Sequence, residues 1–287
     1  MAEMGYDVIL ACRSKTRGED AIRRLNTMIP DARCQFIKCD LASLESIQNF
    51  VDEFHATGKP LHVLCNNAGL TTQMIGRLET DDGFEMTMGV NHLGHFLLTH
   101  LLLDDLKRTA KDCGEARVIV TTSKLHDPES MGGRKGPKAH MDFQNLQLDK
   151  QGTFSGVLAY KNAKLANVLF TYELARRLHG TGVTCNCFHP GFIATTELFR
   201  HFGWPFKAMM YLLSPLLRWF GAIRSLQHGG EMVSFLATDP SLKGVSGKYF
   251  ENFREESSST ESYDENVATK LWKISEELVK LEDKRKI

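Results

Sequence analysis

A tyrosine and a lysine four residues apart, Tyr160 and Lys164, form the pair in this sequence best suited to proton transfer. On a helix, residues four apart share one face and lie one turn from each other. A lysine ammonium near a phenol stabilises the phenolate, which lowers the tyrosine pKa from about 10 toward working pH. Such a tyrosine can exchange a proton with a carbonyl or alcohol oxygen. The alternative, a surface tyrosine beside a solvated lysine, stays open on this spacing alone.

Polar and small residues end two of the apolar, strand-like segments. Ser123 closes the run at 116–123, and residues 67–69 (Asn-Ala-Gly) close the run at 62–69. Ligands of open α/β sheets bind at the carboxyl ends of the strands. We therefore expect Ser123 to hydrogen-bond a substrate oxygen, and Gly69 to let the backbone approach a ligand closely.

Two further positions belong to the same argument. Asn91 lies inside a long helical pattern, where asparagine is locally unfavourable, so a role for its side chain is predicted beside the alternative of an ordinary polar helix position. Pro190 ends the strand-like run at 182–191 and directs the loop that carries Thr195.

Apolar runs alternate with amphipathic helical patterns along the chain. Strands are predicted over 6–12, 34–39, 62–69, 116–123 and 182–191. Helices are predicted over 43–55, 83–108, 157–179 and 264–282, and loops over 127–142 and 251–264. Near-continuous apolar strands suit a parallel sheet covered on both faces. The sequence thus predicts a doubly wound, three-layer α/β/α sheet, in one domain over 1–287.

The charge balance and the cysteines bear on which partners, disulfides and metal sites are expected. The 35 lysines and arginines balance 35 aspartates and glutamates, so no nucleic-acid partner is expected. The seven cysteines include no CxxC pair. Those in strand-like runs are predicted to be reduced core residues, with disulfide or metal partners as the alternative: Cys12, Cys39, Cys65, Cys185 and Cys187. We predict no metal site, no signal peptide, and a reducing intracellular location, cytoplasmic or membrane-associated.

The most apolar stretch is 202–223, which Lys207, Pro215 and Arg218 interrupt. Its uninterrupted part is about half of the ~20 residues that a membrane-spanning helix needs. We predict a substrate lid at about 200–225, or an interfacial patch that contacts a membrane peripherally.

Together these residues resemble the short-chain dehydrogenase/reductase family, from residue 1 to about 250. The resemblance implies a general acid/base, a lysine that lowers its pKa and binds ribose, a carbonyl polariser and an asparagine that holds a relay water: Tyr160, Lys164, Ser123 and Asn91. It also implies residues along the cofactor, from adenine to nicotinamide: Asp40, Leu41, Asn67, Ala68, Gly69, Pro190, Gly191 and Thr195.

Within the family, VNHLGHFLLTHLLLDDL and SGKYF look most like the retinol dehydrogenases and the WW-domain-containing oxidoreductase. This branch implies a lipophilic alcohol or carbonyl substrate, such as a retinoid or sterol, and family members often form homodimers. HPGFIATTELFR also resembles light-dependent protochlorophyllide reductase, which has a cysteine where Ala166 stands here. That branch is the weaker one.

The residue after the first strand bears on the choice of cofactor. An acidic residue there would bond the ribose 2′-hydroxyl, whereas this chain has Arg13, with Lys15 and Arg17 nearby. A guanidinium favours a 2′-phosphate through charge-assisted bonds, so NADP(H) is predicted. The alternative for Arg13 is a charge at a helix start.

The family's glycine-rich TGxxxGIG loop, which holds the pyrophosphate, has no counterpart in this sequence. The resemblance implies that the chain starts at the family's second strand, in a sheet of order 3-2-1-4-5-6-7. Either the strand at 6–12 pairs directly with 61–66, or residues 1–40 are loosely attached. The alternative function is therefore a truncated, non-catalytic chain or binding partner with impaired cofactor binding.

Overall fold

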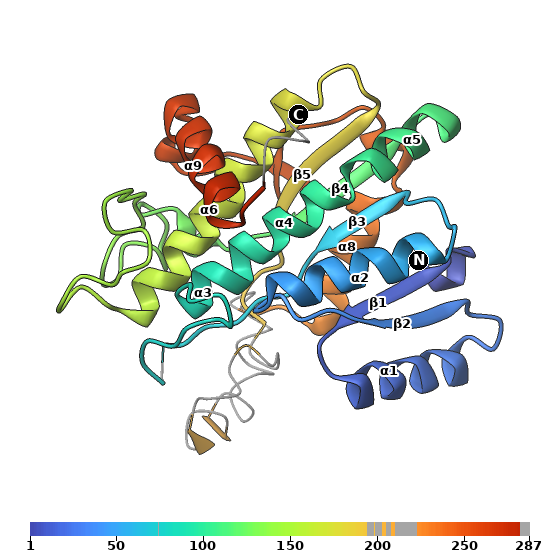
Figure 1. Ribbon diagram of the computed structural model, residues 1–287, viewed down its shortest axis with the longest axis horizontal. Helices are drawn as coiled ribbons and strands as arrows, with labels where there is room; N and C mark the ends of the chain where they lie inside the picture. Colours follow the sequence, from blue (N-terminus) through green and yellow to red (C-terminus); the bar gives the residue numbers. More distant parts are fainter. Residues whose placement is uncertain (74, 194–197, 199–202, 205–207, 210–222, 282–287) are drawn as a thin grey trace.

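The computed structural model describes all residues except 74, 194–197, 199–202, 205–207, 210–222 and 282–287 (Figure 1). The described residues form seven strands: β1 Val8–Cys12, β2 Cys34–Lys38, β3 Val63–Asn66, β4 Ala116–Thr121, β5 Val183–His189, β6 Tyr249–Glu251 and β7 Arg254–Glu256. The main helices are α1 Lys15–Met28, α2 Leu44–Ala56, α3 Met86–Met88, α4 Gly94–Leu101, α5 Leu103–Cys113, α6 Gly156–Arg177, α8 Leu226–Thr238 and α9 Glu265–Leu278. The five strands predicted from apolar runs are all confirmed.

The strands form two separate sheets. β1 and β2 pair in parallel, and a second sheet has the order β3-β4-β5-β6-β7, parallel except for the β6–β7 hairpin. Within the described residues no backbone ladder joins β1 to β3, so the predicted direct pairing of 6–12 with 61–66 is wrong. The order otherwise follows the expected one, with an open position between β1 and β3 (Figure 1).

Side chains join the two sheets where backbone bonds do not. α2 places Ile47, Phe50, Val51 and Phe54 in a core cluster that also holds Ile37 of β2 and Leu64 of β3. At the opposite end of β1, the Asp7 carboxylate lies 3.2 Å from Lys59 Nζ, in the loop before β3. Residues 1–40 are thus attached through apolar contacts and the ion pair of Asp7 with Lys59.

Helices cover both faces of the five-stranded sheet. In Figure 1, α2, α4 and α6 lie in front of the strands, and α8 lies behind them. Because side chains alternate along a strand, Val118 and Val120 enter the core under α4 and α6, whereas Ile119 packs with Met232 of α8. The predicted three-layer α/β/α fold is confirmed. The single domain over 1–287, with a lid at about 200–225, stays a prediction.

Three details differ from expectation. The predicted helix at 83–108 is instead α3, a π-helical turn at Gly89–Leu93, α4 and α5. The predicted loop at 251–264 contains β7, whose side chains are all exposed, so it carries no apolar signal. Cys65 was expected in the core but is exposed, next to the carboxyl end of β3. Cys39, Cys185 and Cys187 are buried free thiols, as expected.

Thr195 and most of 202–223 lie outside the described residues, and so do the predictions made for them. Among the helices that are described, none is both long and apolar enough to cross a bilayer.

Candidate active site

Helix α6 and the end of β4 bring the predicted proton-transfer residues together. Ser155 caps α6 by accepting from the Leu158 N–H, which starts the helix one turn before Tyr160. Gly156 lies against the backbone of Gln73, where an added Cβ would come within 2.5 Å of the Gln73 Cα, so only glycine fits. The start of α6 is therefore fixed against the loop that follows β3.

The Ser123 hydroxyl lies close enough to the Tyr160 phenol to act on its pKa, and Lys164 Nζ lies 5.7 Å from the centre of the tyrosine ring. Burial raises the pKa of Tyr160 to about 12, although the neighbouring Ser123 acts to lower it. The expectation that Lys164 lowers the pKa of Tyr160 is not met in this structure. The ammonium is directed elsewhere: Lys164 Nζ donates to the Thr121 carbonyl oxygen at 3.0 Å.

Lys164 is itself perturbed by its surroundings. The residue is 3% exposed, and burial lowers its pKa from 10.5 to about 8. One carbonyl oxygen is its hydrogen-bond acceptor among the described residues, so two of its three protons remain for a ligand. A lysine that titrates near neutral pH can take part in moving protons as well as in binding.

Asn91 lies beside this pair, in the π-helical turn. Its side chain both accepts from the Leu70 N–H and donates to the Leu70 carbonyl oxygen, each at 2.9 Å. π-helical turns are rare and frequent at functional sites. A Cβ on Gly69 would lie 3.4 Å from Asn91 Oδ1 and 3.5 Å from Lys164 Nζ, so Gly69 keeps open the space between these two side chains.

The predicted cofactor residues lie along the carboxyl ends of the strands. Asn67 accepts at Oδ1 from the Thr121 hydroxyl at 3.0 Å, and residues 67–69 are exposed. Leu41 lies against α4, where a Cβ on Gly94 would come within 2.6 Å of the Leu41 carbonyl oxygen. Asp40 accepts at Oδ1 from the Ala42 N–H. Arg13 is exposed at the end of β1, in the two-stranded sheet, apart from the Tyr160 group.

Pro190 and Gly191 follow β5 as predicted. Gly191 has a φ of 83°, which favours glycine, and its ideal Cβ position would be 2.3 Å from Arg224 Cγ. Arg224 therefore packs directly on this glycine and fixes the start of the loop.

Lys161, the neighbour of Tyr160, anchors the loop between β4 and α6. The residue is 1% exposed, and its Nζ donates to the carbonyl oxygens of Gly133, Lys135 and Pro137 at 2.7, 2.7 and 2.8 Å. These three bonds fasten the loop between β4 and α6 to the helix that carries Tyr160.

Sequence reasoning missed two polar side chains next to the site. Asn167 donates to the Thr121 carbonyl oxygen at 3.2 Å, and His95 Nδ1 lies 3.1 Å from the Asn91 carbonyl oxygen. The sequence contains a feature that could have indicated each of them. An asparagine inside a helix, such as Asn167, is locally unfavourable, and His95 follows Asn91 by four residues. The same rule had singled out Asn91.

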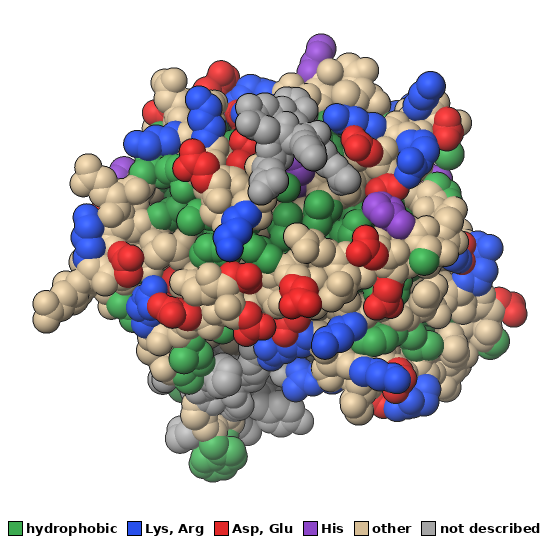
Figure 2. Space-filling view, in the orientation of Figure 1, with side chains coloured by type: hydrophobic (Ala, Val, Ile, Leu, Met, Phe, Trp, Pro, Cys, Tyr) green, Lys and Arg blue, Asp and Glu red, His purple; other side chains and the backbone are tan. Residues whose placement is uncertain are grey.

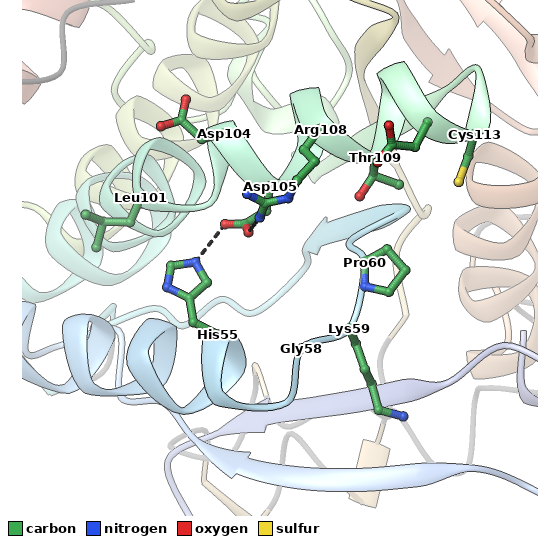
Figure 3. A pocket seen from close by; sticks show the side chains of 11 residues that line it. His55, Gly58, Lys59, Pro60, Leu101, Asp104, Asp105, Arg108, Thr109 and Cys113 are labelled. Carbon is green, nitrogen blue, oxygen red and sulfur yellow. Dashed lines mark hydrogen bonds and ion pairs between the residues drawn. The ribbon is translucent and has the colours of Figure 1, made fainter.

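A large cavity lies elsewhere, between α2 and α5 (Figure 3). Its volume is about 700 Å³, and its wall includes His55, whose Nε2 lies 2.8 Å from Asp105 Oδ2. It is at the opposite end of the strands from Tyr160 and contains none of the predicted site residues. We place the active site at the carboxyl ends of the strands, because the titratable groups of unusual pKa and the exposed glycine-containing turns meet there.

On the face shown in Figure 2, basic and acidic side chains are interspersed. No field of a single sign covers the described part of this face, in keeping with the balanced composition.

The sequence of this chain is similar to those of several known proteins. The family described as short chain dehydrogenase matches residues 1–132. Retinol dehydrogenase 14 from Mus musculus is 38% identical, over 97% of this chain and 80% of its own length. Retinol dehydrogenase 13 from Mus musculus is 40% identical, over 98% of this chain and 78% of its own. The WW domain-containing oxidoreductase from Gallus gallus is 37% identical, over 96% of this chain and 63% of its own.

Solved structures share the fold. An uncharacterised protein from Mycobacterium paratuberculosis has a TM-score of 0.66 and 29% identity, over 97% of this chain and 86% of its own. An actinorhodin polyketide ketoreductase solved with NADPH has a TM-score of 0.62 and 20% identity, over 87% of each chain. From the retinol dehydrogenases that it matches over most of their length, the chain belongs to the short-chain dehydrogenase/reductase family.

Proposed function

We propose that this protein is an NADP(H)-dependent oxidoreductase that interconverts the alcohol and carbonyl forms of a lipophilic small molecule. The observation that carries the proposal is the grouping of three side chains at the end of β4: Ser123 next to the Tyr160 phenol, with Lys164 beside the tyrosine ring. A substrate oxygen placed between the two hydroxyls would receive one hydrogen bond from each.

Each side chain has a distinct task in this proposal. Because the pKa of Tyr160 is raised, the phenol is protonated at neutral pH and can donate its proton to a developing alkoxide. Ser123 holds the substrate oxygen through the charge change. Lys164 binds a ribose hydroxyl, and Asn91 keeps the turn at Leu70 in place next to it. The protonated phenol favours the direction of carbonyl reduction.

The residues present fit the cofactor at both ends. Arg13 is exposed next to Lys15 and Arg17 and can bind a 2′-phosphate. At the other end, Lys164 has two protons to donate, and Gly69 leaves room beside it. Asp40, Leu41 and the exposed turn at 67–69 would line the adenosine half, and Pro190, Gly191 and Thr195 the nicotinamide half. When bound, the nicotinamide supplies or accepts the hydride.

The substrate class rests on the relatives and on apolar exposure near the site. Two of the relatives are named as retinol dehydrogenases. Phe192 and Leu226 are 41% and 59% exposed at the two ends of the segment that contains the predicted lid. Exposed apolar side chains of this kind can contact a lipophilic substrate. Peripheral membrane contact through 202–223 and homodimer formation remain companion proposals, which vesicle flotation and light scattering would test.

A second candidate is a non-catalytic chain or binding partner with weak cofactor affinity. Two observations favour it: the sequence has no glycine-rich pyrophosphate loop, and β1 and β3 face each other without pairing. A protochlorophyllide reductase-like activity is disfavoured, because Ala166 replaces the cysteine and is fully buried in the core.

Two measurements distinguish these candidates. We expect NADPH to bind with a micromolar Kd and to be oxidised when a retinal-like aldehyde is added. Millimolar or undetectable NADPH binding would favour the non-catalytic candidate. Binding without turnover of any aldehyde would reject the substrate class and keep the cofactor.

A further inference from the structure

Buried polar side chains run from Lys164 to the last helix, α9. Asn167, one turn after Lys164 on α6, donates from Nδ2 to the Thr121 carbonyl oxygen at 3.2 Å. The same oxygen accepts from Lys164 Nζ at 3.0 Å. The ring of His92 lies close enough to the Asn167 side chain to be influenced by it, and His92 Nε2 lies 2.9 Å from Ser275 Oγ of α9.

The hydrogen bonds of Ser275 show which atom donates between Ser275 and His92. Its hydroxyl donates its proton to the Leu271 carbonyl oxygen at 2.8 Å, so its oxygen accepts from the Nε2–H of His92. Burial lowers the pKa of His92 to about 3, and the ring is therefore neutral at pH 7.

These side chains are as deeply buried as the apolar core. Asn167 and His92 are each 1% exposed, and Ser275 is 0% exposed. Burying polar groups is costly unless each one is paired, and apolar residues would pack the same space without that requirement. Packing alone would not require this set of buried polar side chains, so we look for another role. The set ends at the Thr121 carbonyl oxygen, which is the acceptor of Lys164.

We propose that Asn167 is a positioning residue for Lys164, itself held in place by His92 and Ser275. This assignment rests on the proposed role of Lys164 beside Tyr160. Two donors share one carbonyl oxygen, and the partial positive charge of the Asn167 amide opposes the full charge of the ammonium. Asn167 thereby fixes where Lys164 Nζ lies, and its amide acts in the same direction as burial, which lowers the pKa of Lys164 to about 8.

Other groups around Lys164 have pKa values shifted away from its own. His95 on α4 and His189 on β5 both interact with Lys164, and burial lowers the pKa of each. Tyr160, on the same helix, has its pKa raised to about 12. Lys124, after β4, is paired with Glu251 at 2.9 Å. Among these groups of shifted pKa, Lys164 is therefore the one that titrates near pH 8.

The test measures the pKa of Lys164 directly, without cofactor or substrate. In protein labelled with ¹³C at lysine Cε, the Lys164 signal is assigned as the one lost in Lys164→Arg, and its shift is followed from pH 6 to 11. Asn167→Leu removes the amide at nearly constant volume. Thr171→Val is the matched control, because the Thr171 hydroxyl is also buried on α6 but donates to the Asn167 carbonyl oxygen, away from Thr121.

We expect Asn167→Leu to raise the pKa of Lys164 by on the order of one unit, and Thr171→Val to leave it unchanged. Ser275→Ala removes the hydroxyl that accepts from His92 and should raise the pKa of Lys164 by less. This variant provides the test if Asn167→Leu fails to fold. An unchanged pKa in the folded network variants, or an equal rise in the control, would overturn the proposal. Because the titration needs no turnover, failure of the proposed oxidoreductase activity is recognised separately.

Discussion

Lys164 Nζ donates to the Thr121 carbonyl oxygen at 3.0 Å and lies 5.7 Å from the centre of the Tyr160 ring. The lysine is thus anchored to β4 and is close to the phenol without a direct charge contact. Burial raises the pKa of Tyr160 and lowers that of Lys164, so at neutral pH the phenol keeps its proton and the ammonium gives one up more readily than a solvated lysine does. The pKa values of Tyr160 and Lys164 are thus shifted in opposite directions, as is typical of paired groups with different roles in proton transfer.

Removing the phenol hydroxyl should remove the proton donor. We expect Tyr160→Phe to lower kcat for NADPH-dependent aldehyde reduction by about 10²–10⁴-fold, with little change in the Kd for NADPH. Tyr172→Phe is the control, since Tyr172 lies on the same helix and bonds Ser258 at 2.7 Å. Equal rates in Tyr160→Phe and the parent would exclude Tyr160 from the mechanism.

Neutralising Lys164 should change how stability depends on pH. The folded pKa of about 8 is below the unfolded value of 10.5, so between these values the unfolded chain binds more protons and stability rises with pH. Relative to Lys164→Met, the parent should gain up to ~3 kcal/mol between pH 8 and 10.5. Urea unfolding at several pH values measures this difference, and parallel curves for the two proteins would contradict it.

Acid should destabilise the protein through two buried histidines. Burial lowers the pKa of His92 to about 3 and of His95 to about 4, whereas both titrate near 6.5 when unfolded. Below pH 6.5 the unfolded chain therefore takes up protons first, and stability falls by about 1.4 kcal/mol per pH unit for each histidine. Urea midpoints from pH 7 to 4.5 should show a shallower decline in His92→Leu than in the parent.

Arg13 should decide between the two nicotinamide cofactors. Replacing it with alanine removes the guanidinium proposed to bind the 2′-phosphate, so the Kd for NADPH should rise by about tenfold or more while that for NADH stays constant. Arg24→Ala provides the comparison, since Arg24 is also exposed on the helix that follows β1. Similar changes in both variants, or for both cofactors, would assign Arg13 no part in the choice.

Lys161 should stabilise the loop that it fastens. Lys161→Met leaves the carbonyl oxygens of Gly133, Lys135 and Pro137 without this donor, at a cost of about 1–3 kcal/mol for each group that water cannot reach. Thermal unfolding should show a lower Tm, and trypsin should cut near Arg134 sooner than in the parent. Lys161→Arg, which keeps donors at this position, should restore part of the loss.

The sequence predicted the fold well where apolar patterning determines it. Buried parallel strands such as β4 and β5 have few polar residues, and their apolar runs identify them directly. β7 could not be found in this way, because it is an exposed edge strand paired only with β6. Cys65 was misplaced because strand composition indicates burial only if both faces are covered.

For the site, residue types and spacing predicted which side chains meet better than how they interact. Spacing placed Tyr160 and Lys164 on one face of α6, and the strand-end rule placed Ser123 next to them. Spacing could not reveal that Thr121 offers its carbonyl oxygen to Lys164, because that depends on how β4 ends against α6. It also could not show that burial outweighs the neighbouring charge in setting the pKa of Tyr160.

The open position between β1 and β3 reverses the usual ranking of backbone protection. In most open α/β sheets the central strands are the slowest to exchange amide hydrogen for deuterium, and the edges are the fastest. Here the inward-facing amides of β1 and β3 have no ladder partner among the described residues, although Leu64 of β3 is 8% exposed. Rapid isotope uptake should therefore begin in the middle of the molecule, beside a well-packed side chain.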